Sequence, residues 1–548
     1  MIAVEPKRRL PMLPVAAMLR AQQTLTAVER FAQEHDEGQL PAQAKYYRNL
    51  IPLERPRSGE QYAFEVDLDA CTGCKACVTA CHSLNGLDET ELWRTVGSLH
   101  GGTASAPVLQ TVTTSCHHCV EPACLLGCPV QAYEKDAVTG IVRHLDDQCF
   151  GCQYCMLMCP YDAPKYNARL GIVRKCDMCE GRLLHGEAPA CVQGCPNQAI
   201  SIRITSQTAA IERSDARNFL PGAPTPEHTL PTTVYRTKKA SPGNLLPADF
   251  YWTSAEHAHP ALVVMLTLTQ LSAGAFAIAL LVEQLSGSPA GSPLAQAAFA
   301  GALAAIALGA SVLHLGRPWL AWRAVLGLRT SWLSREVIAF ALFALLAFVH
   351  GVLVSGSLSA YLPMGASHLV QSGAAMVGAG GVFCSVMVYV ATRRAQWSGT
   401  PTVLKFFGTA LVLGAATVLT VCAFTATGAE PFDRVGRALF WLVSAVTVVK
   451  VGYDVGVVRN YRDPRQSILK RIAIVMLGDL RTATKLRFGL AISGGVIVPL
   501  LLAATGWKGR TAAPATTMML VLLTAGELCE RYLFFRAAPA SRMPGAIR

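Results

Sequence analysis

The cysteines of this 548-residue chain are concentrated in one segment, which constrains the fold more than any other feature. Sixteen of the nineteen lie between Cys71 and Cys195, and only Cys384, Cys422 and Cys529 lie in the remainder. The sixteen form four groups of four: CTGCKACVTAC, CHHCVEPACLLGCP, CFGCQYCMLMCP and CDMCEGRLLHGEAPACVQGCP. Dense cysteines in a small secreted domain would indicate disulfides, but this C-x-x-C spacing favours thiolate ligands of a metal.

The spacing inside the groups predicts iron–sulfur clusters. The first and third groups have the C-x2-C-x2-C-x3-C spacing of bacterial ferredoxins, where three thiolates hold one cluster and the fourth reaches the neighbouring cluster. Four complete groups therefore predict two ferredoxin-like α+β modules in tandem, which bind four [4Fe-4S] clusters. Zinc is the alternative metal, but it needs neither four cysteines in every group nor the proline that follows three of the groups. The sixteen expected iron ligands are Cys71, Cys74, Cys77, Cys81, Cys116, Cys119, Cys124, Cys128, Cys149, Cys152, Cys155, Cys159, Cys176, Cys179, Cys191 and Cys195.

Several basic residues lie close in sequence to these cysteines. His117 and His118 fall inside the second group, whose four cysteines suffice as ligands, so we expect the histidines to shield the cluster or to contact a partner. A cluster with four thiolates carries negative charge, which must be offset where water is excluded. Four nearby cations either supply this charge or are ordinary surface groups: Lys75, Arg174, Lys175 and Arg182.

The sequence after Pro260 is apolar enough to lie in a bilayer. The whole sequence is 52% hydrophobic with a mean hydropathy of +0.34, which is too apolar for an ordinary soluble protein of this length. Eight apolar runs can each span about 30 Å of hydrocarbon, so the sequence predicts an all-α bundle of eight transmembrane helices. The expected spans are residues 260–283, 294–314, 337–357, 368–391, 403–427, 437–458, 487–506 and 514–535.

Basic residues in the predicted loops lie mainly on the side that carries the cysteine segment. That side has nineteen Lys and Arg, whereas the opposite side has Arg434, Arg437, Lys508 and Arg510. By the positive-inside rule, we expect a multi-pass protein of the bacterial inner membrane with the cluster domain and both termini in the cytoplasm. The net charge of +12 is then explained by topology, and because the basic residues form no aromatic-interleaved patch, we expect no nucleic-acid partner.

Composition divides the chain into four segments. Residues 1–60 form an N-terminal extension with a helix expected from Ala21 to His35, and residues 61–204 form the four-cluster domain. Residues 205–255 contain six prolines and are expected to form an extended linker strap, and residues 256–548 form the eight-helix membrane anchor. The apolar stretch from Leu10 to Leu19 contains two prolines and no clear cleavage site, so we expect a packing extension rather than a signal peptide.

Two ionisable residues stand at the cytoplasmic ends of predicted spans. His314 ends the second span in the string HLGRP, and Glu336 opens the third in WLSRE. Burying such groups in or beside a bilayer is costly, so they are functional candidates. A protonatable pair suits a quinol, which loses two protons with two electrons. Alternatively, both residues only cap helix ends, where their charges meet the helix dipole favourably. The spacing alone leaves both interpretations open.

Other ionisable residues lie inside the predicted spans. A haem anchor would need two histidines at matching depth on facing helices, for which His350 and His368 are the candidates. Charged residues at i and i+4 of one helix favour internal ion pairs over a proton path. The two pairs expected on this ground are Lys450 with Asp454 and Glu527 with Arg531.

The order of the four cysteine groups, with the long gap between Cys179 and Cys191, resembles the four-cluster subunit of the dimethyl sulfoxide reductase, polysulfide reductase and sulfite dehydrogenase class. In that family the first and last groups share one module and the middle groups share the other. The resemblance therefore implies a crossed fourth ligand in each cluster. The implied sets are Cys71, Cys74 and Cys77 with Cys195; Cys176, Cys179 and Cys191 with Cys81; Cys116, Cys119 and Cys124 with Cys159; and Cys149, Cys152 and Cys155 with Cys128.

The membrane half resembles the anchor subunit of dimethyl sulfoxide reductase. The resemblance is carried by HLGRP and WLSRE, by His257, Pro260 and Gln270 at the first span, and by AGE at residues 525–527 of the last. It implies that His314 and Glu336 belong to a site for ubiquinone or menaquinone. Two subunits that are normally separate would then be joined in one chain.

The resemblance implies an electron-transfer and membrane-anchor subunit without catalytic groups of its own for the substrate. Electrons would pass between the membrane quinone pool and a separate molybdopterin-containing catalytic subunit docked on the cluster domain. The cytoplasmic placement of the clusters favours a relative such as sulfite dehydrogenase. The alternatives are the same redox chain serving a formate, thiosulfate or polysulfide enzyme and, more remotely, a zinc-regulated membrane transporter.

Overall fold

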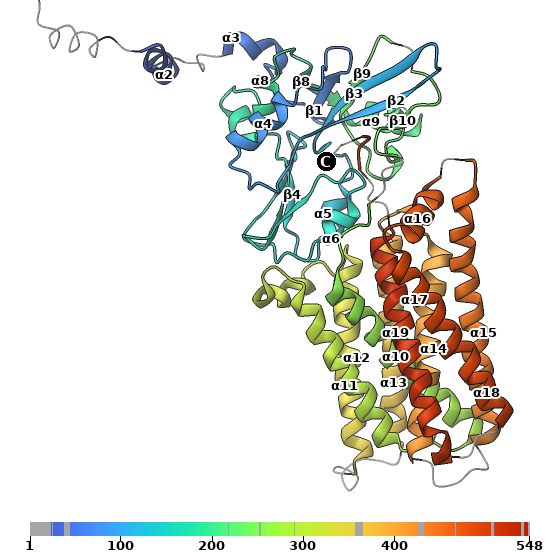
Figure 1. Ribbon diagram of the computed structural model, residues 1–548. Coiled ribbons are helices and arrows are strands. Elements are labelled where there is room, and N and C mark those ends of the chain that lie inside the picture. The colour runs from blue at the N-terminus through green and yellow to red at the C-terminus, as the bar shows by residue number, and fades with distance from the viewer. Residues whose placement is uncertain are drawn as a thin grey trace, which may run out of the picture.

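The computed structural model shows two halves stacked end to end (Figure 1). A cysteine-rich half, residues 44–250, stands on one end of a helical half, residues 254–538, and we call these the cysteine domain and the helix bundle. The structure describes residues 24, 26–37, 44–216, 219–239, 241–250, 254–289, 291–356, 365–425, 432–465, 467–505, 509–538 and 542–545.

The cysteine domain is α+β, as predicted, and is built from short elements around the cysteine loops. Strand β1 pairs antiparallel with β8 over seven residue pairs and parallel with β9, so the segment that precedes the first cysteine group lies beside the one that follows the last. The middle groups each lead through a short helix into a two-stranded hairpin. The elements are β1 Glu60–Asp67, α4 Ala76–Leu84, β2 Thr95–Gly102, β3 Pro107–Thr114, α5 Ala123–Gly127, β4 Tyr133–Lys135, β5 Val142–His144, α6 Tyr154–Met158, β6 Lys165–Asn167, β7 Ile172–Arg174, α7 Glu180–Leu184, α8 Ala190–Gln193 and β8 Ile200–Ser206.

The proline-rich segment differs from the extended strap that was expected. It begins with helix α9 (Gln207–Asp215), whose first turn is capped because the Ser206 hydroxyl accepts from the amides of Thr208 and Ala209. It then adds strand β9 (Val234–Arg236) beside β1 and strand β10 (Leu246–Pro247) beside β2. The segment therefore completes two sheets of the cysteine domain before it reaches the bundle.

The helix of the N-terminal extension, α2, runs over Ala27–Glu37, and the expected residues 21–23 and 25 lie outside the described part of the chain. A capping box sets its start. The Thr26 amide donates to the Glu29 carboxylate at 2.7 Å, and the Glu29 amide donates to the Thr26 hydroxyl at 3.2 Å. Farther along, Tyr47 at the end of α3 (Ala44–Tyr47) is 1% exposed, so this part of the extension packs into the cysteine domain.

The described part of the bundle contains eight helices long and apolar enough to cross a membrane, as predicted. The first span begins and the last ends on the side of the cysteine domain, where the Glu256 amide donates to the carbonyl of Arg536 at 3.0 Å. The helices are α10 Pro260–Ser286, α11 Pro293–Leu313, α12 Trp332–Val354, α13 Ala366–Val390, α14 Gly399–Thr425, α15 Phe432–Arg459, α17 Arg481–Ile492 continued through a π-turn by α18 Val498–Thr505, and α19 Ala513–Arg536.

Four spans start four or more residues earlier than the apolar runs indicated: α12, α14, α15 and α17. Helix α12 begins at Trp332 rather than 337 because its first turn contacts the cysteine domain, and α17 begins at Arg481 rather than 487. A further helix, α16 (Ile468–Leu477), lies in a connection that the sequence suggested was a loop. Its start is capped because the Ser467 hydroxyl accepts from the Lys470 amide at 3.2 Å.

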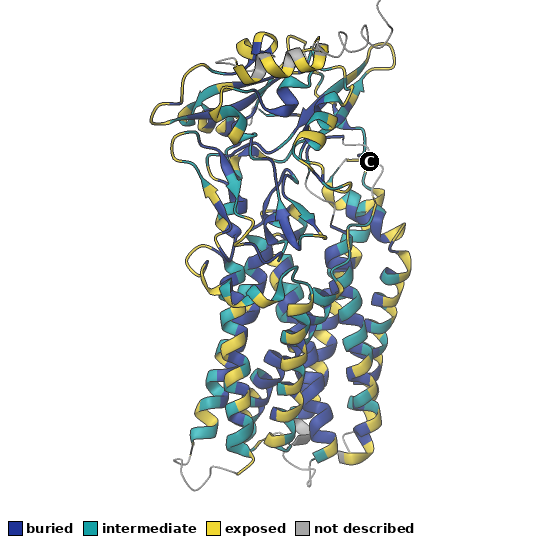
Figure 2. Cartoon of the chain, turned by 90° about the vertical axis from the view of Figure 1, so that its left-hand side faces the viewer, coloured by how far each residue is buried: buried dark blue, intermediate teal, exposed yellow. Residues whose placement is uncertain are grey.

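Helices α10 and α14 form the centre of the bundle. In the most apolar stretch of each helix, 72% of the residues of α10 and 89% of those of α14 are buried. The corresponding shares are 28% for α11 and 22% for α12. A side chain at Gly274 of α10 would clash with the backbone of Ala410 in α14, so the two helices touch backbone to backbone. Figure 2 shows the buried residues facing this centre and the exposed ones facing outward.

Candidate functional site

The three Cys-Pro sequences open the same tight turn. In the second group, Gln131 has a left-handed backbone (φ 54°), and the Ala132 amide then points back to Cys128 Sγ at 3.2 Å. An N–H donor at this place stabilises negative charge on sulfur, as a cluster ligand requires. The same turn follows Cys159, through Asp162 to Ala163, and Cys195, through Gln198 to Ala199. The repeated pattern C-P-x-x-A announces these turns, and the prediction overlooked its alanine.

Most of the sixteen cysteines are buried. Eleven are buried, four are half-buried, and Cys74 is exposed. Burial raises the pKa of Cys81 to about 12 and those of Cys159 and Cys179 to about 11. Such thiols give up their protons when a cation takes their place, so cluster loading is coupled to proton release.

The thiols gather across the sequence groups. Burial raises the pKa of Cys77, and the neighbouring thiols of Cys191 and Cys195 raise it further. The thiols that raise one another's pKa fall into four neighbourhoods. They are Cys77 with Cys191 and Cys195; Cys81 with Cys179 and Cys191; Cys116, Cys119 and Cys124 with Cys159; and Cys149, Cys152 and Cys155 with Cys128.

Two cations are buried among these thiols. Arg94 is 2% exposed; burial alone would lower its pKa, but the thiols of Cys191 and Cys77 hold that pKa above its usual value. Lys175 is 3% exposed and lies between Cys116 and Cys176. Of the four cations named from the sequence, Lys175 fits the offsetting role. The other three are an exposed Lys75, Arg174 paired with Glu91, and Arg182 paired with Glu187. Arg94 was missed because it lies between two cysteine groups.

His117 and His118 both point inward rather than toward a partner. His117 Nδ1 lies 2.8 Å from the Thr233 hydroxyl, and its ring meets Tyr161 edge-on at 4.5 Å. His118 Nδ1 accepts from the Val142 amide at 3.1 Å. Burial lowers the pKa of His117 to about 3, so it is neutral and fills space around the second group.

The third cysteine group rests directly on the helix bundle. A side chain at Gly316, just after α11, would clash with the backbone of Gly171, which in turn touches Gly151 of the third group. On the other side of this group, the Tyr154 hydroxyl donates to the carbonyl of Val388 at 2.8 Å. Of the expected cluster ligands, those of the third group and Cys128 of the second, whose carbonyl faces Gly327, therefore lie at the junction with the membrane half.

Arginines of the bundle fasten this junction. Arg317 donates to the carbonyl of Asp146 at 3.0 Å, and Arg323 donates to that of Asp147 at 2.9 Å. Arg394 donates to the carbonyls of Met156 and Leu157, both at 3.0 Å. Three of the basic residues that indicated topology therefore also hold the cysteine domain on the bundle.

Glu336 lies close beneath the third group. It is 4% exposed, and the hydroxyl of Ser385 on α13 donates to its carboxylate. Its charge influences Tyr154, which stands between Cys152 and Cys155 in the third group. The start of α12 thus places a buried carboxylic acid within electrostatic range of Tyr154, a residue between two expected cluster ligands.

His314 lies apart from Glu336. It follows α11, its Nδ1 atom is buried without a hydrogen-bond partner, and burial lowers its pKa. It lies within electrostatic range of His259, whose ring packs on Phe535 at 5.8 Å. Among the described residues no hydrogen bond or ion pair joins His314 to Glu336, so the structure does not bring the two into direct contact.

The other ionisable residues in the spans are paired differently from the prediction. Lys450 pairs with Glu527 on another helix instead of Asp454, and Asp454 pairs with Arg487 at 3.3 Å. Arg531 faces Gln270 at 2.8 Å instead of Glu527. The i, i+4 rule failed because these helices are buried on several faces, and partners on neighbouring helices satisfy the charges better than the next turn does.

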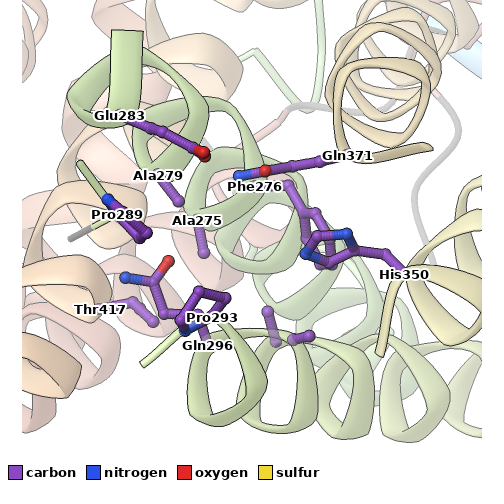
Figure 3. A pocket seen from close by; sticks show the side chains of 12 residues that line it. Ala275, Phe276, Ala279, Glu283, Pro289, Pro293, Gln296, His350, Gln371 and Thr417 are labelled. Atoms are coloured by element: carbon purple, nitrogen blue, oxygen red, sulfur yellow. The ribbon is translucent and has the colours of Figure 1, made fainter. Parts of the chain in front are cut away.

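The two histidines considered for haem do not face each other. His350 is buried, contacts the carbonyl of Ser367 at 3.1 Å and lines a small pocket with Glu283 and Gln371 (Figure 3). His368 is exposed on the first turn of α13. Burial on one helix and exposure on the next place the two rings on different faces, which does not suit an axial pair.

Comparison with known proteins finds a matching family for each half of the chain. Residues 108–204 match the family model "4Fe-4S dicluster domain", and residues 255–536 match "DMSO reductase anchor subunit (DmsC)". The B subunit of anaerobic dimethyl sulfoxide reductase from Haemophilus influenzae is 38% identical over 150 residues, covering 26% of this chain and 73% of that protein. The probable anaerobic dimethyl sulfoxide reductase subunit YnfG of Escherichia coli K12 is 38% identical over 148 residues, 26% and 72% of the two proteins. The protein NrfC homolog of H. influenzae is 33% identical over 180 residues, 32% and 76%.

Fold, cysteine pattern and family matches together define an iron–sulfur electron-transfer protein with a multi-pass membrane anchor. This polypeptide belongs to the dimethyl sulfoxide reductase family and joins an iron–sulfur subunit to the DmsC anchor subunit in one molecule. The resemblance inferred from the sequence is thereby confirmed, and the transporter alternative falls away.

Proposed function

We propose that the protein carries electrons between a membrane quinone, ubiquinone or menaquinone, and a separate molybdopterin-containing catalytic subunit. The observation that carries this proposal is the junction. Tyr154, which lies between Cys152 and Cys155 in the sequence, is within electrostatic range of the buried carboxylate of Glu336 and donates to the carbonyl of Val388 at the end of a span. Electrons leaving a quinone at Glu336 would meet the third cysteine group without crossing the rest of the protein.

The thiol neighbourhoods support four [4Fe-4S] clusters with crossed fourth ligands. Cys195 lies by Cys77, and Cys128 lies by Cys149, as two modules require. The pairing of β1 with β8 supports a module made from the first and last groups. Cys176 lies next to Cys116, which connects the two modules. The cluster sites would therefore form a row from the exposed Cys74 to the junction, and the catalytic subunit would dock at the Cys74 end.

At the junction, the residues would exchange the protons of the quinone. A hydroquinone that gives two electrons to the clusters also releases two protons, and a carboxylate held by Ser385 is placed to accept them. The imidazole of His314, neutral at pH 7 because burial lowers its pKa, would hydrogen-bond the other quinone oxygen. Because the two residues are not in contact, the quinone head would lie between them.

Different observations favour two substrate classes for the catalytic partner, and a formate, thiosulfate or polysulfide enzyme stays an alternative. The names of the relatives favour a sulfoxide reductase. The surplus of basic residues on the cluster side favours cytoplasmic clusters in the inner membrane, and hence an enzyme such as sulfite dehydrogenase. A reporter fused to the C-terminus tests the two: cytoplasmic activity supports the second class, and activity outside the cytoplasm supports the first, because the resemblance to dimethyl sulfoxide reductase implies clusters that face the periplasm.

The quinone site is tested with Glu336→Gln in the assembled complex. Loss of the carboxylate should lower hydroquinone-linked turnover by about 10²-fold, while iron content and dye-linked turnover of the catalytic subunit stay at the wild-type level. Glu283→Gln is the matched control, because Glu283 is a span carboxylate at the far end of the bundle. Wild-type hydroquinone turnover in Glu336→Gln would show that Glu336 is only a helix-end residue.

A further inference from the structure

Arg94 is a buried arginine whose charge no carboxylate balances. The residue is 2% exposed, and in the described part of the chain no Asp or Glu forms an ion pair with it. The nearest acid in the sequence, Glu91, instead pairs with Arg174 at 3.1 Å and accepts from the side-chain amide of Asn167 at 2.9 Å. Burying a charge without a counter-charge is costly. The negative charge that offsets Arg94 must therefore come from other groups.

Strand pairing fixes the place of Arg94. It directly precedes β2, which pairs with β3 over eight residue pairs. Its Nη1 atom donates to the Thr113 hydroxyl at 3.2 Å, and its Nη2 atom donates to the Ser115 hydroxyl at 2.8 Å. The guanidinium carbon lies 4.7 Å from the centre of the Phe64 ring, and Nε is buried without a hydrogen-bond partner in the described structure. These partners are neutral, so they hold the guanidinium in place without neutralising it.

Thr113 connects Arg94 to an expected cluster ligand. The hydroxyl oxygen of Thr113 lies 3.5 Å from Cys77 Sγ. Because this oxygen accepts from Arg94, its own hydrogen is free to point at the sulfur. A hydrogen-bond donor stabilises negative charge on a ligand sulfur. Arg94, Thr113 and Cys77 therefore form a chain of hydrogen bonds from a fixed positive charge to the sulfur.

Arg94 also stands between two expected cluster sites. Burial alone would lower the pKa of Arg94, but the thiols of Cys191 and Cys77 hold it above its usual value, so both lie within electrostatic range. In the proposed ligand sets these two cysteines belong to different clusters of the module that the first and last groups would form. Both lie with Phe64 in one hydrophobic core of buried residues, where little water can screen the charge.

We propose that Arg94 is a positioning residue for electron transfer, whose charge raises the reduction potential of both clusters of this module. Thr113 adds to the effect at the cluster of Cys77. The inference rests on the proposed four clusters. Each cluster gains one electron, and so one negative charge, when it is reduced, and a fixed positive charge nearby stabilises that form. A guanidinium does not release its proton in proteins, so the effect does not depend on pH.

The test is Arg94→Gln in the full-length protein, with the clusters followed by electron paramagnetic resonance during a redox titration. At a fixed potential, the ratio of reduced to oxidised cluster should fall about 10-fold for two of the four clusters. This ratio corresponds to about 59 mV for a one-electron couple. The shift should persist at high salt, because a buried charge is screened little. Wild-type potentials in a variant with the full iron content would overturn the proposal.

Two further variants separate the charge from the hydrogen bond. Arg94→Lys keeps the charge but loses the forked pair of donors, so it should restore most of the ratio lost in Arg94→Gln. Thr113→Val keeps Arg94 and removes the hydroxyl, so the potential of the Cys77 cluster alone should fall, and by less. If Arg94→Gln loses iron, Thr113→Val decides: a lowered potential of that cluster supports the proposal, and four wild-type potentials overturn it.

Arg169→Gln is the matched control. The Arg169 side chain is 67% exposed and pairs with Asp88 at 3.0 Å, so the variant removes the same unit of charge where water screens it. Its four potentials should match the wild type, and a shift equal to that of Arg94→Gln would overturn the proposal. If the wild-type protein shows no iron–sulfur signals, the proposed function fails. If it shows four clusters and Arg94→Gln leaves every potential unchanged, only the role of Arg94 fails.

Discussion

The cysteine domain and the helix bundle bury charge in opposite ways. In the cysteine domain the polar atoms around the expected ligands are mostly backbone amides in repeated turns, as from Ala132 to Cys128, helped by two buried cations. In the bundle the backbone amides of a span are used within its helix, so side chains on different helices must satisfy one another, as Lys450 and Glu527 do.

This difference follows from where each half finds its hydrogen-bonding groups. Local turns place sulfur atoms at fixed positions along the sequence, which suits rigid sites for electron transfer. Cross-helix side chains such as Glu527 have several partners each, so the charge of that carboxylate is balanced by residues on three other helices. The cysteine domain and the helix bundle touch where Gly316 meets Gly171, so the position of one half relative to the other depends on this backbone contact.

The largest expected effect comes from forcing the two halves apart. Gly316→Ala places a methyl group against the backbone of Gly171, and a displacement of about 1 Å at a transfer site can cost about 10²-fold in rate. Hydroquinone turnover should fall by that order while the iron content is unchanged. Gly309→Ala on the adjoining helix is the control, because its methyl group meets nothing. Equal turnover in the two variants would show that the halves are coupled elsewhere.

A smaller effect distinguishes crossed from uncrossed ligands in the cysteine domain. Cys195→Ser should empty the site of Cys71, Cys74 and Cys77, because Cys195 lies beside Cys77. Iron should fall from about sixteen to about twelve atoms per molecule, with the signal of one cluster lost. If spectroscopy showed damage to the cluster of Cys176, Cys179 and Cys191 instead, the crossed arrangement would be wrong.

The smallest effect concerns the histidines at the junction. Burial is the main cause that lowers the pKa of His259 to about 4, and the charges of His257 and His314 lower it further. An unfolded histidine titrates near 6.5. Between these values the unfolded state binds more protons, so stability falls as the pH drops, by about 2 kcal/mol from pH 6.5 to 5. Thermal melting in detergent should therefore lose less stability on acidification in His259→Gln than in the wild type. An identical pH dependence would contradict the burial of this ring.

The parts of the fold that sequence predicted well are those with a local cause. Eight apolar runs gave eight helices because bilayer thickness fixes their length. Helix α16 was missed because it lies in a connection between spans, where the count of apolar runs gave no signal, and α9 because a proline-rich composition hides a helix capped by Ser206. The start of α12 was missed because contact with the cysteine domain, not hydropathy, extends it.

In the candidate site, too, features with a local sequence signal were predicted and features set by tertiary contacts were not. The neighbourhoods of Cys128 with Cys149 and of Cys195 with Cys77 were implied by the family resemblance, whereas Arg94 belongs to no recognisable motif. The ion pairs of the spans could not be assigned, because a sequence shows neighbours one turn away and hides those on the next helix. The ion pair between Lys450 and Glu527 depends on how the helices of the bundle pack together.

The central claim is that a membrane quinone exchanges electrons directly with the cysteine domain. Stopped-flow mixing of the purified protein, without a catalytic subunit, with a hydroquinone tests it most directly. The account predicts that the visible absorbance of the oxidised clusters bleaches within the mixing experiment in the wild type, and that Glu336→Gln bleaches about 10²-fold more slowly. Clusters that dithionite bleaches but the hydroquinone leaves oxidised, at a potential where reduction is favourable, would contradict it.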